Sequence, residues 1–69
     1  MAGLTNRLRD FREQAGLTQA ALAERIGVSR KTVNTIENDV FVPSTVLALK
    51  LAKSLGTSVE AIFSLEDDT

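Results

Sequence analysis

Four polar residues at helical spacing carry the chemistry that this sequence could perform. They are Arg30, Lys31, Asn34 and Thr35. At 100° per residue, the last three share one side of a helix and Arg30 lies on the flank. Arg and Lys suit the O6 and N7 acceptors of guanine, Asn suits N6 and N7 of adenine, and a Thr methyl can touch thymine. The pattern could read base edges, although by itself it is more typical of a solvated helix face.

The composition excludes most other chemistry. The chain has 69 residues with no Cys and no His, which removes disulfides, Cys or His metal ligands and Ser-His-Asp catalysis. We therefore expect no metal, no cofactor, no catalytic residue and no small-molecule substrate. The Asp67-Asp68 pair could imitate catalytic carboxylates, but it stands at a chain end with nothing to orient it.

Length and charge limit the organisation of the chain. We expect one domain over residues 1–69, and a chain this short is marginally stable alone, which leaves dimerisation open. Residues 1–59 carry eight basic and five acidic side chains, whereas the last ten carry four acidic and none basic. This predicts a basic body and an acidic tail at 65–69, which is most simply a solvating segment. Without a signal peptide or a membrane span, we expect a cytoplasmic protein with no membrane partner.

Apolar periodicity and punctuating residues predict helices only. Thr18 and Ser29 are suitable N-caps, Gly27 can take a positive φ between them, and no segment alternates long enough for a strand. The predicted helices span about 5–15, 18–26, 29–38, 44–55 and 58–64. The expected fold class is all-α, with five short helices.

The second and third predicted helices meet in a sharp turn. The linker Gly27-Val28-Ser29 is too short for anything else, and Leu22, Ile26 and Val33 supply apolar contacts across it. This pattern predicts a helix-turn-helix, although any corner between two helices needs apolar residues and a glycine.

Residues 17–38, LTQAALAERIGVSRKTVNTIEN, resemble the Xre family of λ-repressor/Cro-type regulators. The resemblance continues through PS at 43–44, ALKLAKSLG at 48–56 and SVEAIF at 58–63, so that it covers about residues 4–63. It implies a compact five-helix λ-repressor-like DNA-binding domain whose third helix enters the major groove of double-stranded DNA. Within that context, Arg30, Lys31, Asn34 and Thr35 become the expected base-reading residues.

The resemblance also implies contacts to the DNA backbone. Gln19 begins the second helix, where free N–H groups and the helix dipole favour a phosphate. Ser29, Thr32 and Asn38 are further phosphate candidates. The alternatives are an ordinary polar first-turn residue at Gln19 and plain helix capping at Ser29 and Asn38.

Glu37 falls on the inward side of the third helix, where a lone carboxylate would be costly. Arg12 follows Leu8 by one helical turn and so leans over the core side of the first helix. We expect an Arg12–Glu37 ion pair with a structural role, and similar family members carry such a pair.

The sequence departs from the family pattern after Asn38. Where the family usually has Gly and a basic residue, this chain has Asp39 and Val40. An apolar loop and two outward aliphatic residues on the fourth helix favour self-association instead. The expected homodimer interface is Val40, Val42, Val46, Leu49 and Leu65. Scattered exposed aliphatic side chains are the alternative, and Phe41 could simply fold into the core.

The predicted function is sequence-specific regulation of transcription. We expect a repressor that binds an inverted repeat as a homodimer, with half-site centres about 10 base pairs apart. One alternative is an antitoxin-type regulator whose acidic tail or apolar patch engages a toxin. Another is a protein-interaction module that has lost DNA binding. RNA is a poorer partner because there is no Tyr or Trp for base stacking. The operator, the regulated gene and the sign of regulation are left open.

Overall fold

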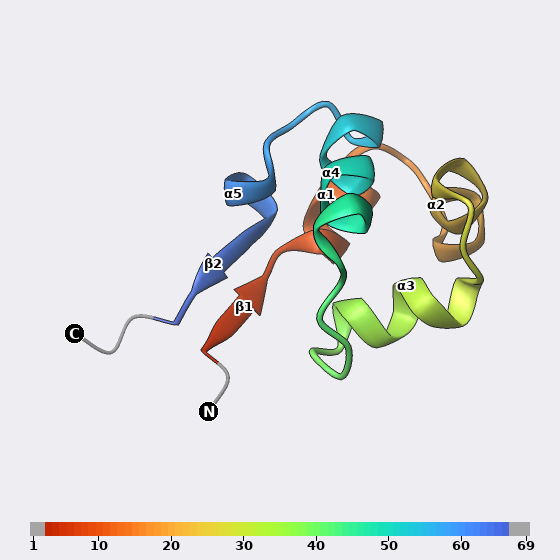
Figure 1. The fold of residues 1–69 in the computed structure, drawn as a ribbon. Helices are drawn as coiled ribbons and strands as arrows, with labels where there is room; N and C mark the ends of the chain where they lie inside the picture. The colour runs from red at the N-terminus through yellow and green to blue at the C-terminus, as the bar shows by residue number, and fades with distance from the viewer. Residues whose placement is uncertain (1–2, 67–69) are drawn as a thin grey trace.

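The two ends of the described chain pair with each other. The computed structural model describes residues 3–66, and its elements follow the order β1 (Leu4–Asn6), α1 (Leu8–Gln14), α2 (Gln19–Ile26), α3 (Arg30–Glu37), α4 (Thr45–Ser54), α5 (Val59–Ile62) and β2 (Phe63–Leu65). The strands are antiparallel, with Leu4 opposite Leu65 and Asn6 opposite Phe63. Figure 1 shows this small ribbon on one side of the helices, with α2 and α3 on the other.

The ribbon corrects the all-α expectation at both ends. The first helix begins at Leu8 instead of residue 5 because the Asn6 side-chain oxygen accepts a hydrogen bond from Leu8 N at 3.0 Å and ends the extended segment there. The last helix ends at Ile62 instead of residue 64, and Phe63–Leu65 turns into strand β2. A three-residue strand is too short to show a period of two. Leu4 fits the helical spacing, yet it packs on the core from a strand.

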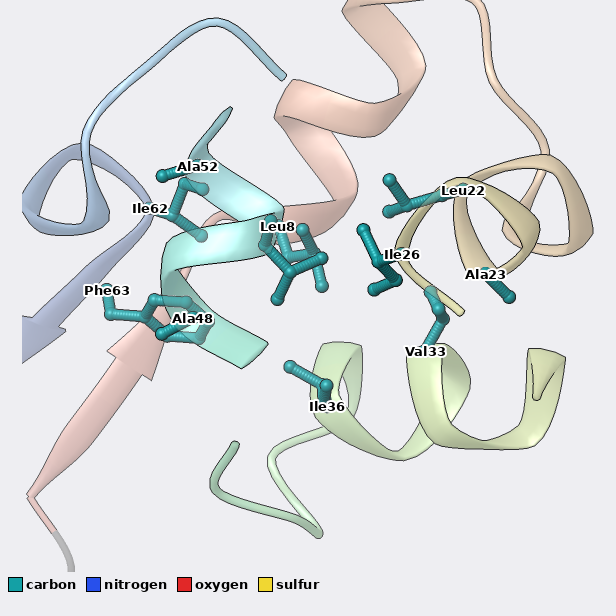
Figure 2. Close-up of a cluster of buried hydrophobic side chains, with 11 residues drawn as sticks. Leu8, Leu22, Ala23, Ile26, Val33, Ile36, Ala48, Ala52, Ile62 and Phe63 are labelled. Carbon is teal, nitrogen blue, oxygen red and sulfur yellow. The ribbon is translucent and has the colours of Figure 1, made fainter. Parts of the chain in front are cut away.

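One apolar cluster joins all five helices of the described chain to β2. Leu8, Leu22, Val33, Leu51 and Ile62 are completely buried within it. Figure 2 shows Leu8 at its centre, with Leu22 and Ile26 from α2 facing Val33 and Ile36 from α3. The core therefore fixes α3 through one face only, and the opposite face is left for solvent or a ligand.

Hydroxyl side chains begin four of these helices. Thr18, Ser29, Ser44 and Ser58 each accept a hydrogen bond from the backbone N–H three residues later. Such caps satisfy N–H groups that a helix cannot satisfy itself. The N-caps expected at Thr18 and Ser29 are thus present.

No helix within residues 3–66 is long and apolar enough to cross a lipid bilayer. Of the acidic tail expected at 65–69, Leu65 is paired in β2, whereas Asp67, Asp68 and Thr69 lie outside the described residues.

Candidate nucleic-acid interface

The turn between α2 and α3 sets the direction of α3. Gly27 takes a φ of 77°, a conformation that a side chain would strain, and Val28 N donates to Ala23 O at 3.0 Å. Ala23 of α2 is 3% exposed, and α2 and α3 pack against each other. The predicted helix-turn-helix arrangement is therefore present, and it holds α3 across the end of α2.

The expected base-reading residues lie together on the outer side of α3. Val33 and Ile36 are buried on the inner side. Arg30 and Lys31 are exposed, and Asn34 and Thr35 are half-buried. The outer face of α3 therefore offers hydrogen-bond donors of two cations and one amide.

Gln19 connects the start of α2 to that face. Its amide nitrogen donates to Glu37 Oε1 at 3.0 Å, and its amide oxygen lies 3.4 Å from Arg30 Nη1 and 3.5 Å from Asn34 Nδ2. The last two contacts are long for hydrogen bonds. Gln19 therefore binds Glu37 and lies close to Arg30 and Asn34, while its phosphate contact stays a prediction.

The other three phosphate candidates make local hydrogen bonds. Ser29 Oγ caps α3 by accepting from Thr32 N at 3.2 Å, and the Ser29 and Thr32 hydroxyl oxygens are 3.1 Å apart. The Asn38 amide donates to Asn34 O at 2.8 Å. The capping alternative is therefore realised at both Ser29 and Asn38, and at Ser29 the cap takes up the Thr32 N–H.

A buried ion pair ties α3 to α1. Arg12 Nε is 2.6 Å from Glu37 Oε2, and Arg12 Nη2 is 3.2 Å from Glu37 Oε1. The Glu37 side chain has no exposed area, and the Arg12 side chain is 11% exposed. Arg12 also donates to Leu17 O at 2.9 Å. The structure thus places Arg12 against Glu37 as the sequence predicts, and it connects both to the segment before α2.

Glu37 has two further partners that were not predicted from the sequence. Arg9 Nε lies 3.4 Å from Glu37 Oε1, and Gln19 donates to the same oxygen. Arg9 precedes Arg12 by three residues, so both face the same side of α1. That spacing was the available signal for Arg9.

The surroundings of Glu37 keep it ionised. Burial raises the pKa of Glu37, but hydrogen bonds from Arg12 and Gln19 and the Arg12 charge together lower it by more, so that the pKa lies below its ordinary value. The hydrogen bond to Glu37 in turn raises the pKa of Arg12. The pair is therefore charged at neutral pH.

A second contact holds the end of α3. Asp39 has a φ of 61°, and its carboxylate accepts a hydrogen bond from the Asn6 amide at 2.8 Å. The same amide nitrogen is 3.0 Å from Ile36 O. Asp39 therefore occupies the position of the family glycine because Asp tolerates the left-handed conformation and because Asn6 supports it. No pattern in the sequence indicates this role of Asn6.

The residues expected at a dimer interface are all exposed. Val40, Val42, Val46, Leu49 and Leu65 have exposed fractions between 56% and 83%. Phe41 is 46% exposed, so it does not fold into the core.

Leu65 shares a sheet face with Phe63 and with its partner Leu4. Leu4 and Phe63 line an apolar hollow of about 350 Å³. Its full lining is Leu4, Val42, Pro43, Thr45, Ala48, Leu49, Val59 and Phe63.

Known proteins are similar to this chain over the segment that contains the candidate interface. Residues 8–62 match the family model described as helix-turn-helix. An uncharacterised helix-turn-helix-type transcriptional regulator of Methanocaldococcus jannaschii is 45% identical over 65 residues, covering 94% of this chain and 98% of that protein.

Solved structures resemble this fold as well. The P22 c2 repressor in complex with synthetic operator 9T is similar with a TM-score of 0.76 and 31% identity, covering 78% of this chain and 82% of the repressor chain. The restriction-modification controller protein C.AhdI of Aeromonas hydrophila has a TM-score of 0.75 and 36% identity, covering 80% and 83% of the two chains.

Proposed function

This chain belongs to the helix-turn-helix family of DNA-binding transcriptional regulators, and from that membership we propose that it is a homodimeric repressor of an inverted-repeat operator. The observation that carries the proposal is the outer face of α3. It displays Arg30, Lys31 and Asn34 on a helix whose other face is locked into the core. A repressor that occupies a promoter needs no catalytic group.

The proposed base contacts follow from position along α3. Recognition helices present their N-terminal residues to base edges. Lys31 and Thr35 occupy the centre of the outer face, and Arg30 and Asn34 lie beside Gln19. We assign the first pair to bases and the second pair to bases or nearby phosphates.

The proposed phosphate contacts come from the two helix starts and the end of α3. Gln19 is the first residue of α2, and Ser29 caps the start of α3. Thr32 lies on the first turn of α3, and Asn38 caps its end. Helix N-termini and hydroxyl groups are common phosphate ligands in DNA complexes. These contacts would fix the register of α3 without reading sequence.

The proposed dimer surface surrounds the hollow beside α4. Val42 and Leu49 line this hollow, and Val46 lies on α4 together with Leu49. Leu65 lies on strand β2 next to the hollow residue Phe63. Each of these four side chains is at least 56% exposed, and exposed apolar groups that gather in one region favour a protein contact. Val40 belongs to the same proposed interface but stands at its edge next to α3. A two-fold axis here would present two copies of α3 to successive major grooves, about 34 Å apart.

The similarity to an operator-bound repressor favours DNA binding over the interaction-module alternative, which the absent basic residue at position 40 supports. An antitoxin-type regulator would bind DNA as well, and it differs from the proposed repressor in requiring a toxin partner. A cytoplasmic location, as expected from the sequence, would give the protein access to its DNA target, and it stays a prediction.

In vitro selection on random duplex DNA at about 0.1 M salt tests the proposal. We expect an inverted repeat with about 10 base pairs between half-site centres. Affinity should fall with salt at a log–log slope near −0.9 per neutralised phosphate. A single half-site would keep DNA binding and refute the dimer, and no enrichment by folded protein would refute both.

A further inference from the structure

A basic hollow lies between the end of α2 and the end of α4, and the contacts proposed above do not use it. It measures about 570 Å³, and its lining contains the cations Arg25, Lys50 and Lys53, with Glu24 as the single carboxylate of the lining. None of its lining residues belongs to α3. The basic hollow therefore carries an excess of positive charge apart from the proposed base-reading face.

The three cations have no acidic partner in the part of the chain that the structure describes. The ion pairs within residues 3–66 are those of Glu37 with α1, and Arg25, Lys50 and Lys53 are exposed. Arg25 and Lys53 lie in the last turns of their helices, where the helix dipole favours a cation. The dipole does not explain why both face one hollow together with Lys50. An anionic partner would explain it.

The basic hollow adjoins the surface that we propose for dimerisation. Val46 and Leu49 of that surface are followed on α4 by Lys50 and Lys53, and all four side chains are exposed. Residues three, four and seven positions apart lie on the same side of a helix. The apolar and the cationic residues therefore form one strip along α4, and a chain segment that packs on its apolar part can continue onto its cations.

This chain contains an acidic segment directly after a residue of the proposed dimer surface. Leu65 is followed by Glu66, Asp67 and Asp68, and the last ten residues contain no base. Glu66 is exposed, and its backbone N–H donates to Gly3 O. That hydrogen bond fixes where the acidic segment (residues 66–68) leaves the ribbon, beside an apolar side chain that is itself exposed.

We propose that the acidic segment of one protomer binds the basic hollow of its partner. Figure 1 shows the end of β2 on the opposite side of the helices from α2, and the two residues after Glu66 add at most about 7 Å of chain. A second copy is therefore the better source of the segment than the same chain. The inference rests on the proposed dimer, in which Leu65 packs on the apolar part of the partner's α4 and two-fold symmetry makes the contact reciprocal.

Two charge-reversed proteins test the contact. Asp67→Lys with Asp68→Lys reverses the segment, and Lys50→Glu with Lys53→Glu reverses the hollow. Sedimentation equilibrium without DNA at low salt should show that each protein alone dimerises about tenfold more weakly, because like charges then face each other. An equimolar mixture should dimerise as tightly as the unmodified protein, because each protomer offers its partner the opposite charge. In about 1 M salt these differences should nearly disappear.

A control and a second measurement separate this contact from general effects of charge. Asp10→Lys with Glu13→Lys makes the same change of charge at exposed positions of α1 and should leave dimerisation unchanged. Urea titration of each variant reports folding separately from association. If the cations serve only the ends of α2 and α4, the hollow reversal lowers stability, the mixture recovers no dimer, and the contact is overturned.

The outcomes distinguish this inference from the proposed function. If the unmodified protein is monomeric both alone and on the inverted repeat, the proposed dimer fails and the contact fails with it. If Val46→Glu disrupts a dimer that both charge reversals leave intact, the dimer stands and the contact is overturned. The contact is also overturned if the hollow reversal weakens binding to a single half-site without weakening dimerisation, which would assign the cations to the DNA backbone.

Discussion

Glu37 connects α3 to two other helices through its carboxylate. Its carboxylate receives Arg12 and Arg9 from α1 and Gln19 from α2, so that one side chain joins the three helices. Replacing a buried ion pair by apolar residues can be harmless, but removing one partner leaves an uncompensated charge. The Gln19 amide that binds Glu37 also approaches Arg30 and Asn34, so the pair acts on the outer face of α3 as well as on stability.

Arg12→Met should destabilise the protein because the buried Glu37 carboxylate loses its shortest contact. We expect a loss of about 3–5 kcal/mol in the free energy of unfolding, measured by urea titration at pH 7. The double variant Arg12→Met, Glu37→Met should recover most of it because no charge is left buried. Unchanged stability in the single variant would show that the pair is not needed to hold the fold.

The lowered pKa of Glu37 makes stability depend on acid. A carboxyl group whose pKa is lower in the folded state stabilises that state above its unfolded pKa and loses this contribution as pH falls through the folded pKa. The urea midpoint should therefore drop between about pH 5 and pH 3. Glu37→Gln should flatten this part of the profile, whereas Glu24→Gln at an exposed site should leave it steep. Equal profiles for the two variants would contradict the assignment.

Local side-chain chemistry decided which elements could be predicted from the sequence. Thr18 and Ser29 begin helices through contacts only three residues long, and the periodicity of each helix is read within one segment. The ribbon joins residues about 60 positions apart, and Asn6 contacts Asp39 from 33 positions away. No local pattern encodes such pairings, so both ends of the chain were assigned to helix, and the support of the α3 terminus was missed.

The cap of α3 and its proposed phosphate contact can be separated at Ser29. Ser29→Ala should cost about 1 kcal/mol of stability and weaken DNA binding. Ser29→Asp keeps a capping oxygen but adds a negative charge where a phosphate is expected. Its stability should stay close to that of the unmodified protein, measured by thermal unfolding, while its affinity for the operator falls at least tenfold. Equal affinity would place Ser29 away from the DNA backbone.

The contact between β1 and the end of α3 is testable at both of its residues. Asn6→Ala should lose about 1–2 kcal/mol because three hydrogen bonds of the amide disappear. Asp39→Ala keeps the positive φ without the contact and should also destabilise, whereas Asp39→Gly relieves the backbone and should be the milder change. Urea titration of the three variants checks the order. An Asp39→Gly protein less stable than Asp39→Ala would show that the left-handed backbone at position 39 carries no strain that glycine relieves.

At the scale of the whole molecule, the distribution of exposed groups separates two functions. The polar outer face of α3 and the apolar patch at Val42, Val46, Leu49 and Leu65 belong to different elements, yet the loop from Val40 to Val42 connects them. A two-fold dimer through the patch would therefore set the spacing of the two α3 helices. The sequence could predict the exposure of Val46 and Leu49 because it follows from helical phase, whereas the hollow that Leu4 and Phe63 help to line depends on the unpredicted ribbon.

Val46→Glu tests this coupling because it adds a charge to the patch without touching the core. Val46 is 64% exposed, so circular dichroism should show a folded chain. Sedimentation velocity should show a shift from dimer to monomer, since a buried unpaired charge is costly at an interface. Affinity for the inverted repeat should fall steeply, while affinity for a single half-site should change little because α3 is intact. Gln14→Glu, which adds the same charge at the exposed end of α1, should leave both properties unchanged. A Val46→Glu protein that stays dimeric and binds the full operator would place the dimer interface elsewhere on the molecule.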